Sequence, residues 1–187
     1  MQLITFQLPT AWTIVLFALL WFLLHLTASA VSHRIDEKYL SVEKALFKTR
    51  TWEKEGQLYD RLLRAKKWKK FLPEIYLFKQ GVLKEILSKK EPGTKKKELL
   101  EQYLLESCRA ELSHWLAITP FWIFRFFAPP PVIPYMLLYA LAANIPCIII
   151  QRYNRPRITK LLLKSSSESA GNLTSVFSTL RKLEPGN

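Results

Sequence analysis

The strings RAELSHW, at residues 109–115, and QRYNRPR, at residues 151–157, enclose an apolar stretch on which the predicted topology depends. The first string lies where a charged segment becomes apolar, and the second lies where the last apolar segment becomes charged again. An apolar hairpin between them, with segments at 115–127 and 132–150, would bring both strings to the same face of a membrane. We therefore expect the two strings to form one site at a membrane boundary.

A third apolar segment, at residues 11–31, is long enough to cross a bilayer, which needs about 20 residues. The alternative is a cleaved signal peptide, because Ala28–Ala30 resembles a cleavage site, but the segment lacks a basic start and is long for that role. Segment 115–127 spans about 20 Å as a helix against about 30 Å of hydrocarbon, so it is either a short pass or a re-entrant half-helix. The sequence predicts an all-α integral membrane protein with three membrane passes.

The charge of the chain predicts its orientation. Its 187 residues include 28 Lys and Arg against 15 Asp and Glu, a formal net charge of +13. Only Arg125 of these basic residues lies in the hairpin, none precedes residue 32, and the rest lie in the middle or after residue 150. Because basic segments stay on the cytoplasmic side, we expect a multi-pass protein of the cell membrane with most of its mass on the cytoplasmic face.

We predict a single membrane domain over residues 1–187. Basic and aromatic residues interleave in its middle part, which favours interfacial helices on anionic membrane lipid over a nucleic-acid surface, so no nucleic acid is expected as a partner. Pro73 is expected to begin one helix, and Pro156 to end the last one. The predicted segments are a first span at 11–31, basic cytoplasmic or interfacial helices at 32–113, hairpin segments at 115–127 and 132–150, a basic motif at 151–163 and a mobile tail at 164–187.

Glu111 and His114 carry the candidate chemistry of the first string. Their three-residue separation places both on one face of a helix. A neutral histidine can take a proton from an alcohol while a carboxylate orients its ring, so we expect His114 as general base and Glu111 as its partner. The alternative is an interfacial histidine bonded to a backbone carbonyl. A di-iron site would need two Glu-x-x-His motifs, and the chain has one such motif and three histidines, so no metal is expected.

The second string adds groups that suit phosphates and oxyanions. Arginine binds phosphate through a planar fork of donors, and Asn154 can donate to a developing oxyanion as a third catalytic residue. The phosphates would belong to an acyl donor such as acyl-CoA, or to a phospholipid, and no cofactor is expected. The residues expected to bind substrate or donor in the two strings are Arg109, Arg152, Tyr153, Arg155 and Arg157.

At these two strings the chain resembles the glycosyl-4,4'-diaponeurosporenoate acyltransferase family, whose enzymes place a fatty acyl chain on a glycosylated carotenoid. The family carries closely similar strings where this chain has Arg109–Trp115 and Ala143–Arg157. The resemblance covers roughly residues 33–163 in the same order, apart from residues 72–98. Further upstream matches are Arg34-Ile35, Lys38-Tyr39, Phe47, Glu53-Lys54, Gly56 and Lys67-Trp68-Lys69.

The resemblance implies an acyltransferase that esterifies a sugar hydroxyl of a membrane glycolipid. The implied partners are a glycosylated carotenoid or isoprenoid and a fatty acyl donor, and the matching middle segment adds Trp68 and Lys69 to the expected binding residues. The alternative from a different class is a non-catalytic membrane subunit that binds anionic lipid or a partner protein through its basic segment.

Overall fold

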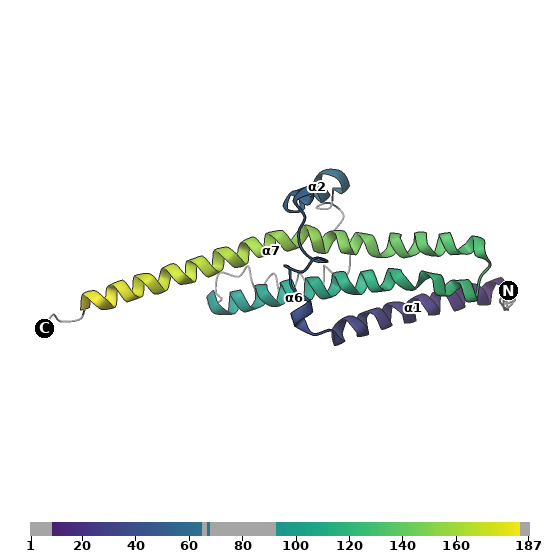
Figure 1. The fold of residues 1–187 in the computed structure, drawn as a ribbon, viewed down its shortest axis with the longest axis horizontal. Helices are drawn as coiled ribbons and strands as arrows, with labels where there is room; N and C mark the ends of the chain where they lie inside the picture. The colour runs from purple at the N-terminus through teal and green to yellow at the C-terminus, as the bar shows by residue number, and fades with distance from the viewer. Residues whose placement is uncertain (1–8, 65–66, 68–92, 184–187) are drawn as a thin grey trace. The chain divides into compact units, whose positions relative to one another are not determined.

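A computed structural model describes residues 9–64, 67 and 93–183 of the chain. Within these residues the protein is helical and contains no strand (Figure 1), which confirms the all-α prediction for this part of the chain. The predicted helix that begins at Pro73 lies outside the described residues. The elements are α1 (Thr10–Arg34), η1 (Glu37–Tyr39), η2 (Thr51–Gly56), α2 (Gln57–Leu63), α6 (Gly93–Ile118), η5 (Thr119–Phe126), η6 (Pro130–Val132) and α7 (Ile133–Leu183).

Two segments, Ala11–Arg34 and Pro130–Ser167, are long and apolar enough to cross a membrane. They include the predicted spans at 11–31 and 132–150. The predicted short pass between them divides into the end of α6 and the 3₁₀ helix η5. Since Pro120 has no N–H for the carbonyl of Leu116, the Thr119 hydroxyl donates to that carbonyl instead, at 2.9 Å. A third membrane pass stays a prediction.

The prediction that Pro156 ends the last helix is wrong, because α7 continues through this proline to Leu183. A proline inside a helix removes one hydrogen bond and crowds the preceding turn. Here the turns on both sides are held by burial of Tyr153, Arg155 and Ile158. Tertiary packing thus offsets the local cost of the proline. The tail predicted from residue 164 is helical up to Leu183, and its mobility stays a prediction.

The chain divides into two compact units. Unit 1 comprises Met1–Lys48 and Glu106–Arg152, and unit 2 comprises Thr49–Leu105 and Tyr153–Asn187. Both α6 and α7 therefore contribute residues to each unit. A single membrane domain over the whole chain stays a prediction.

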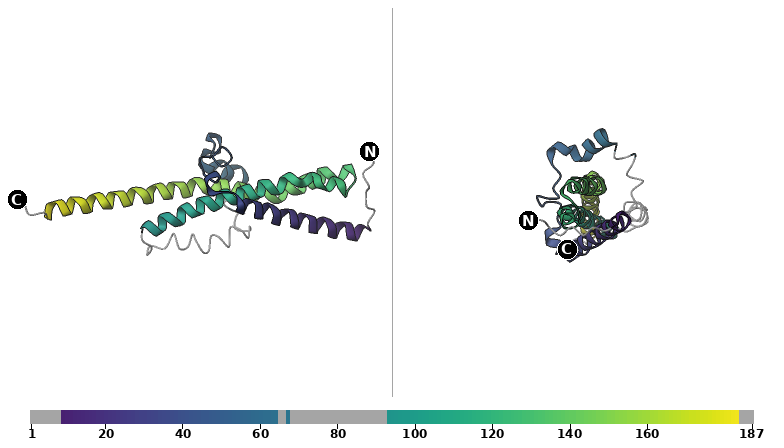
Figure 2. Two further views of the ribbon diagram at one scale, coloured as in Figure 1. Left: turned by 60° about the horizontal axis from the view of Figure 1, so that its bottom comes forward. Right: turned by 90° about the vertical axis from the view of Figure 1, so that its right-hand side faces the viewer.

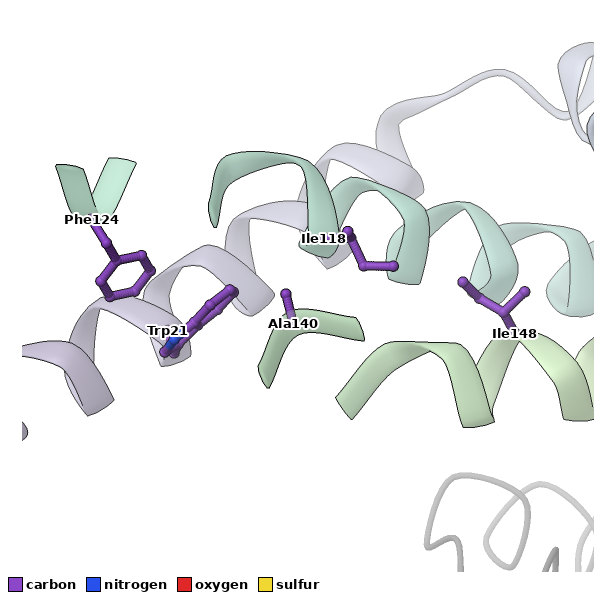
Figure 3. Close-up of a cluster of buried hydrophobic side chains, with 5 residues drawn as sticks. All are labelled: Trp21, Ile118, Phe124, Ala140 and Ile148. Atoms are coloured by element: carbon purple, nitrogen blue, oxygen red, sulfur yellow. The ribbon is translucent and has the colours of Figure 1, made fainter. Parts of the chain in front are cut away.

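An apolar cluster forms the core of unit 1, where α1, the end of α6 with η5, and the start of α7 lie side by side (Figures 1 and 2). Figure 3 shows the five buried side chains of this cluster. The ring of Trp21 lies 4.9 Å from the ring of Phe124, centroid to centroid. Large apolar side chains elsewhere on α1, such as Trp12 and Phe22, are exposed. A helix that is apolar all round suits lipid contact on its outer face. The cluster comprises Trp21, Ile118, Phe124, Ala140 and Ile148.

A tight left-handed turn is the most unusual backbone feature of unit 2. Lys54, Glu55 and Gly56 follow one another with φ angles of +46°, +56° and +84°. The turn is held by the buried carboxylate of Glu53, which accepts hydrogen bonds from the Tyr59 hydroxyl at 2.8 Å and from the Arg50 backbone N–H at 3.0 Å. The turn brings the backbone of Gly56 against the backbone of Tyr153 in α7.

Gly56→Ala should lower the free energy of unfolding by about 1–3 kcal/mol, the cost of a strained backbone conformation. An added Cβ would lie 2.9 Å from the Tyr153 carbonyl oxygen, and its φ of +84° disfavours any side chain. The measurement is denaturant unfolding of the protein in detergent micelles, with Gln57→Ala on the exposed start of α2 as the control. Equal stability of the two variants would argue against this close approach.

Candidate active site

His114 on α6 and Asn144 on α7 are joined by a hydrogen bond in unit 1. His114 Nδ1 lies 2.9 Å from Asn144 Oδ1, and Asn144 Nδ2 donates to the carbonyl of Ala140 at 2.9 Å. Because that carbonyl can only accept, the amide of Asn144 must turn its oxygen toward the histidine. His114 Nδ1 therefore carries the hydrogen, and in the neutral ring the lone pair lies on Nε2. The lone pair of the neutral ring thus lies on the nitrogen that a general base would use.

Glu111, one turn before His114, is fully buried and paired with an arginine of α7. Arg152 Nε donates to Glu111 Oε1 at 2.9 Å, and Trp115 Nε1 donates to the same oxygen at 3.4 Å. Arg152 Nη2 also donates to the backbone carbonyl of Leu46. Two nitrogen atoms of Arg152 are thus engaged within unit 1, where they tie α7 to α6 and to the segment that follows α1.

Arg109, at the start of the first string, forms an ion pair with Glu106 one turn earlier on α6. Its side chain is 12% exposed and that of Glu106 is 30% exposed, so the pair is partly shielded from water. The arrangement keeps a positive charge on the same helix as Glu111 and His114.

Residues of the second string that follow Arg152 belong to unit 2, where Asn154 forms a hydrogen bond with Tyr103 of α6. Burial raises the pKa of the Tyr103 hydroxyl above its usual value, while the bond with Asn154 and the charge of Arg155 act in the opposite direction. The hydroxyl therefore keeps its proton at neutral pH. The guanidinium of Arg157 lies 3.6 Å from the centre of the Tyr153 ring, a cation–π contact that holds this exposed arginine in place.

The predicted site residues therefore fall into two groups. Unit 1 holds Arg109, Glu111, His114 and Arg152, and unit 2 holds Tyr153, Asn154, Arg155 and Arg157. Trp68 and Lys69 lie outside the described residues. One site shared by both groups, with Asn154 as a catalytic residue, stays a prediction.

Sequence reasoning did not identify Asn144 as a hydrogen-bond partner of His114. The structure places the amide of Asn144 at the Nδ1 position, and the expectation that Glu111 orients His114 stays a prediction. The signal was present, because a carboxamide inside an apolar helix must find hydrogen-bond partners, and neighbouring helices supply them. The sequence alone did not show which residue of α6 that partner would be.

The family model and the similar proteins carry the same family name. The family model for glycosyl-4,4'-diaponeurosporenoate acyltransferase matches residues 43–164. A glycosyl-4,4'-diaponeurosporenoate acyltransferase of Staphylococcus aureus strain USA300 is 34% identical over 143 residues, which cover 76% of this chain and 83% of the relative. The protein of the same name from the bovine strain RF122 / ET3-1 is 33% identical with the same coverage. No solved structure matches the chain.

Proposed function

The chain belongs to the glycosyl-4,4'-diaponeurosporenoate acyltransferase family, and from that membership we propose that it esterifies a sugar hydroxyl of a membrane glycolipid with a fatty acyl group. It is an enzyme that transfers acyl groups, as the name of the family and of its relatives states. The acceptor that we propose is a glycosylated carotenoid or a related isoprenoid. Family membership favours this function over a non-catalytic membrane subunit.

The observation that carries the proposal is the orientation of His114 by Asn144, which leaves the lone pair on Nε2. A sugar hydroxyl is a poor nucleophile until a base takes its proton. His114 Nε2 accepts that proton as the sugar oxygen attacks the acyl carbonyl carbon. The ester C–O bond then forms, the bond from the acyl carbon to the donor breaks, and the imidazolium returns its proton to the leaving group. No cofactor is required beyond the acyl donor, for which acyl-CoA is one candidate.

We propose separate roles for the charged residues around this base. Glu111 and Arg152 position α6 against α7 through their buried pair. Asn154 would donate to the oxyanion, and Arg155 and Arg157 would bind phosphate groups of the donor or of a phospholipid. Further contacts to substrate or donor are proposed for Arg109, Tyr153, Trp68 and Lys69.

The proposed function is tested by incubating the purified protein with a glycosylated isoprenoid and an isotope-labelled acyl donor, either acyl-CoA or phospholipid. Mass spectrometry should detect the labelled ester of the glycosylated lipid. The matched control is the same isoprenoid without its sugar, which should remain unmodified because it lacks the acceptor hydroxyl. If no donor yields an ester on any sugar-bearing lipid, the non-catalytic subunit becomes the better interpretation.

We also propose a multi-pass arrangement in the cell membrane, with three passes and most of the mass in the cytoplasm. It is supported by the two apolar helices and by the concentration of basic residues in the segments between and after them. In this arrangement Gly93, at the start of α6, lies on the cytoplasmic side.

A cysteine introduced as Gly93→Cys should resist a membrane-impermeant thiol reagent in intact cells. The native cysteines are first removed by Cys108→Ala and Cys147→Ala, so that the new thiol is the only target. Labelling should become rapid once the membrane is permeabilised, which controls for access to the thiol. Equal labelling in intact cells would reverse the proposed orientation.

A further inference from the structure

We propose that Asn144 is a positioning residue that holds the neutral ring of His114 in the tautomer with its hydrogen on Nδ1. The inference rests on the proposed function, because it assigns a second residue to the same site. It concerns a residue of α7, 30 positions away from the histidine in the chain. Its role is to place the lone pair of the neutral ring on Nε2, the nitrogen that would take the proton of the acceptor hydroxyl.

The burial of Asn144 strengthens its hydrogen bond with His114. Its side chain is 1% exposed, so water does not compete for either end of the amide. One end is fixed on the Ala140 carbonyl and the other on His114 Nδ1. An unconstrained neutral imidazole populates both tautomers, and the tautomer with hydrogen on Nε2 has no lone pair there. A bond that selects one tautomer therefore raises the fraction of molecules that can react.

The partner at Nδ1 is a neutral amide, whereas many catalytic histidines use a carboxylate there. The nearest acidic residue on the same helix is Glu111, and its carboxylate is paired with Arg152 of α7. On α1 the titratable residues are His25, His33 and Arg34. Nδ1 of His25 and of His33 each faces a carbonyl of its own helix, at 2.8 and 2.9 Å. Those two rings thus share the predicted tautomer without Asn144, and they serve as internal controls.

The test measures the tautomer directly in protein labelled with ¹⁵N-histidine and held in detergent micelles at a pH where the rings are neutral. Two-bond ¹H–¹⁵N spectra distinguish hydrogen on Nδ1 from hydrogen on Nε2. All three rings of the wild type should carry hydrogen on Nδ1. In Asn144→Leu, which keeps the volume but loses the acceptor, only the His114 signals should move toward the other tautomer. In Asn144→Asp, which keeps an acceptor, the His114 signals should remain those of the tautomer with hydrogen on Nδ1.

The acylation assay adds a second readout. Asn144→Leu should lower kcat at least about tenfold with little change in KM, since a wrongly protonated histidine costs serine proteases about 10⁴ in kcat. Asn144→Asp should recover much of the rate, with the acid side of the pH profile moved to higher pH because a carboxylate stabilises the imidazolium. Ala142→Leu, on the exposed side of α7, is the matched control and should behave like the wild type.

Wild-type spectra with hydrogen on Nε2 of His114 would overturn the inference, and so would an Asn144→Leu protein with unchanged spectra and rate. If Asn144→Leu does not fold, the wild-type and Asn144→Asp spectra still decide, because hydrogen on Nε2 of His114 in either neutral ring would contradict the inference. If the wild type acylates no glycolipid, the proposed function fails, while the spectra still decide the role of Asn144.

Discussion

His114→Ala should lower the turnover of sugar acylation by about a hundredfold or more, the usual loss when a general base is removed. Alanine cannot take the proton of the acceptor hydroxyl. Among the described residues, His114 is the side chain that forms a hydrogen bond with the Asn144 amide. The rate is measured by following the labelled ester with purified, reconstituted protein. The wild-type rate should also fall at acid pH, because a protonated imidazole can no longer act as a base.

His33→Ala is the matched control for this variant. His33 lies exposed at the end of α1, where its Nδ1 faces the Ser29 carbonyl of the same helix, so its loss should leave turnover unchanged. Circular dichroism and the unfolding transition should show that both variants fold. A folded His114→Ala protein with wild-type turnover would falsify the mechanism, although the family membership would stand.

Arg152→Gln should lower the free energy of unfolding by about 3–5 kcal/mol, the expected cost of leaving a buried charge without its partner. Glu111 has 0% exposure, and the Arg152 side chain has only 14%, so water cannot replace the lost ion pair. The variant also loses the hydrogen bond to the Leu46 carbonyl, which ties down the segment after α1. Denaturant unfolding in detergent micelles measures the change.

The double variant Glu111→Gln with Arg152→Gln should recover a large part of this loss, because it removes both charges together. The control is Lys160→Gln, which breaks the ion pair of Lys160 with Glu55. Those side chains are 63% and 57% exposed, so this change should cost no more than about 1 kcal/mol. If the double variant is as unstable as Arg152→Gln alone, the lost stability comes mainly from the hydrogen bonds of Arg152 and not from the unpaired buried charge.

The apolar segments were predictable because composition alone indicates them. Residues 11–31 and 132–150 fall within the apolar segments Ala11–Arg34 and Pro130–Ser167, which are longer than a bilayer needs. The end of the last helix was not predictable in the same way. The rule that a proline breaks a helix describes local cost, whereas α7 continues past Pro156 because burial of its neighbours outweighs that cost.

The candidate site was also predictable only in part. Helical spacing placed Glu111 and His114 on one face of α6, but it could not supply their partners on α7. Asn144 and Arg152 meet them only because packing sets the register between the two helices. The left-handed turn at Lys54 and Glu55 also escaped prediction, since residues other than glycine seldom adopt a positive φ.

The two polar pairs that join α6 to α7 have a consequence for how the protein becomes active. His114–Asn144 and Glu111–Arg152 lie at different heights along the helices, and a slip of one turn, about 5.4 Å, would separate both. A chain whose α6 and α7 have not yet packed against each other therefore lacks the hydrogen bond that orients His114. If His114 is the base that we propose, such a chain would leave surrounding lipids unmodified until the two helices have packed together.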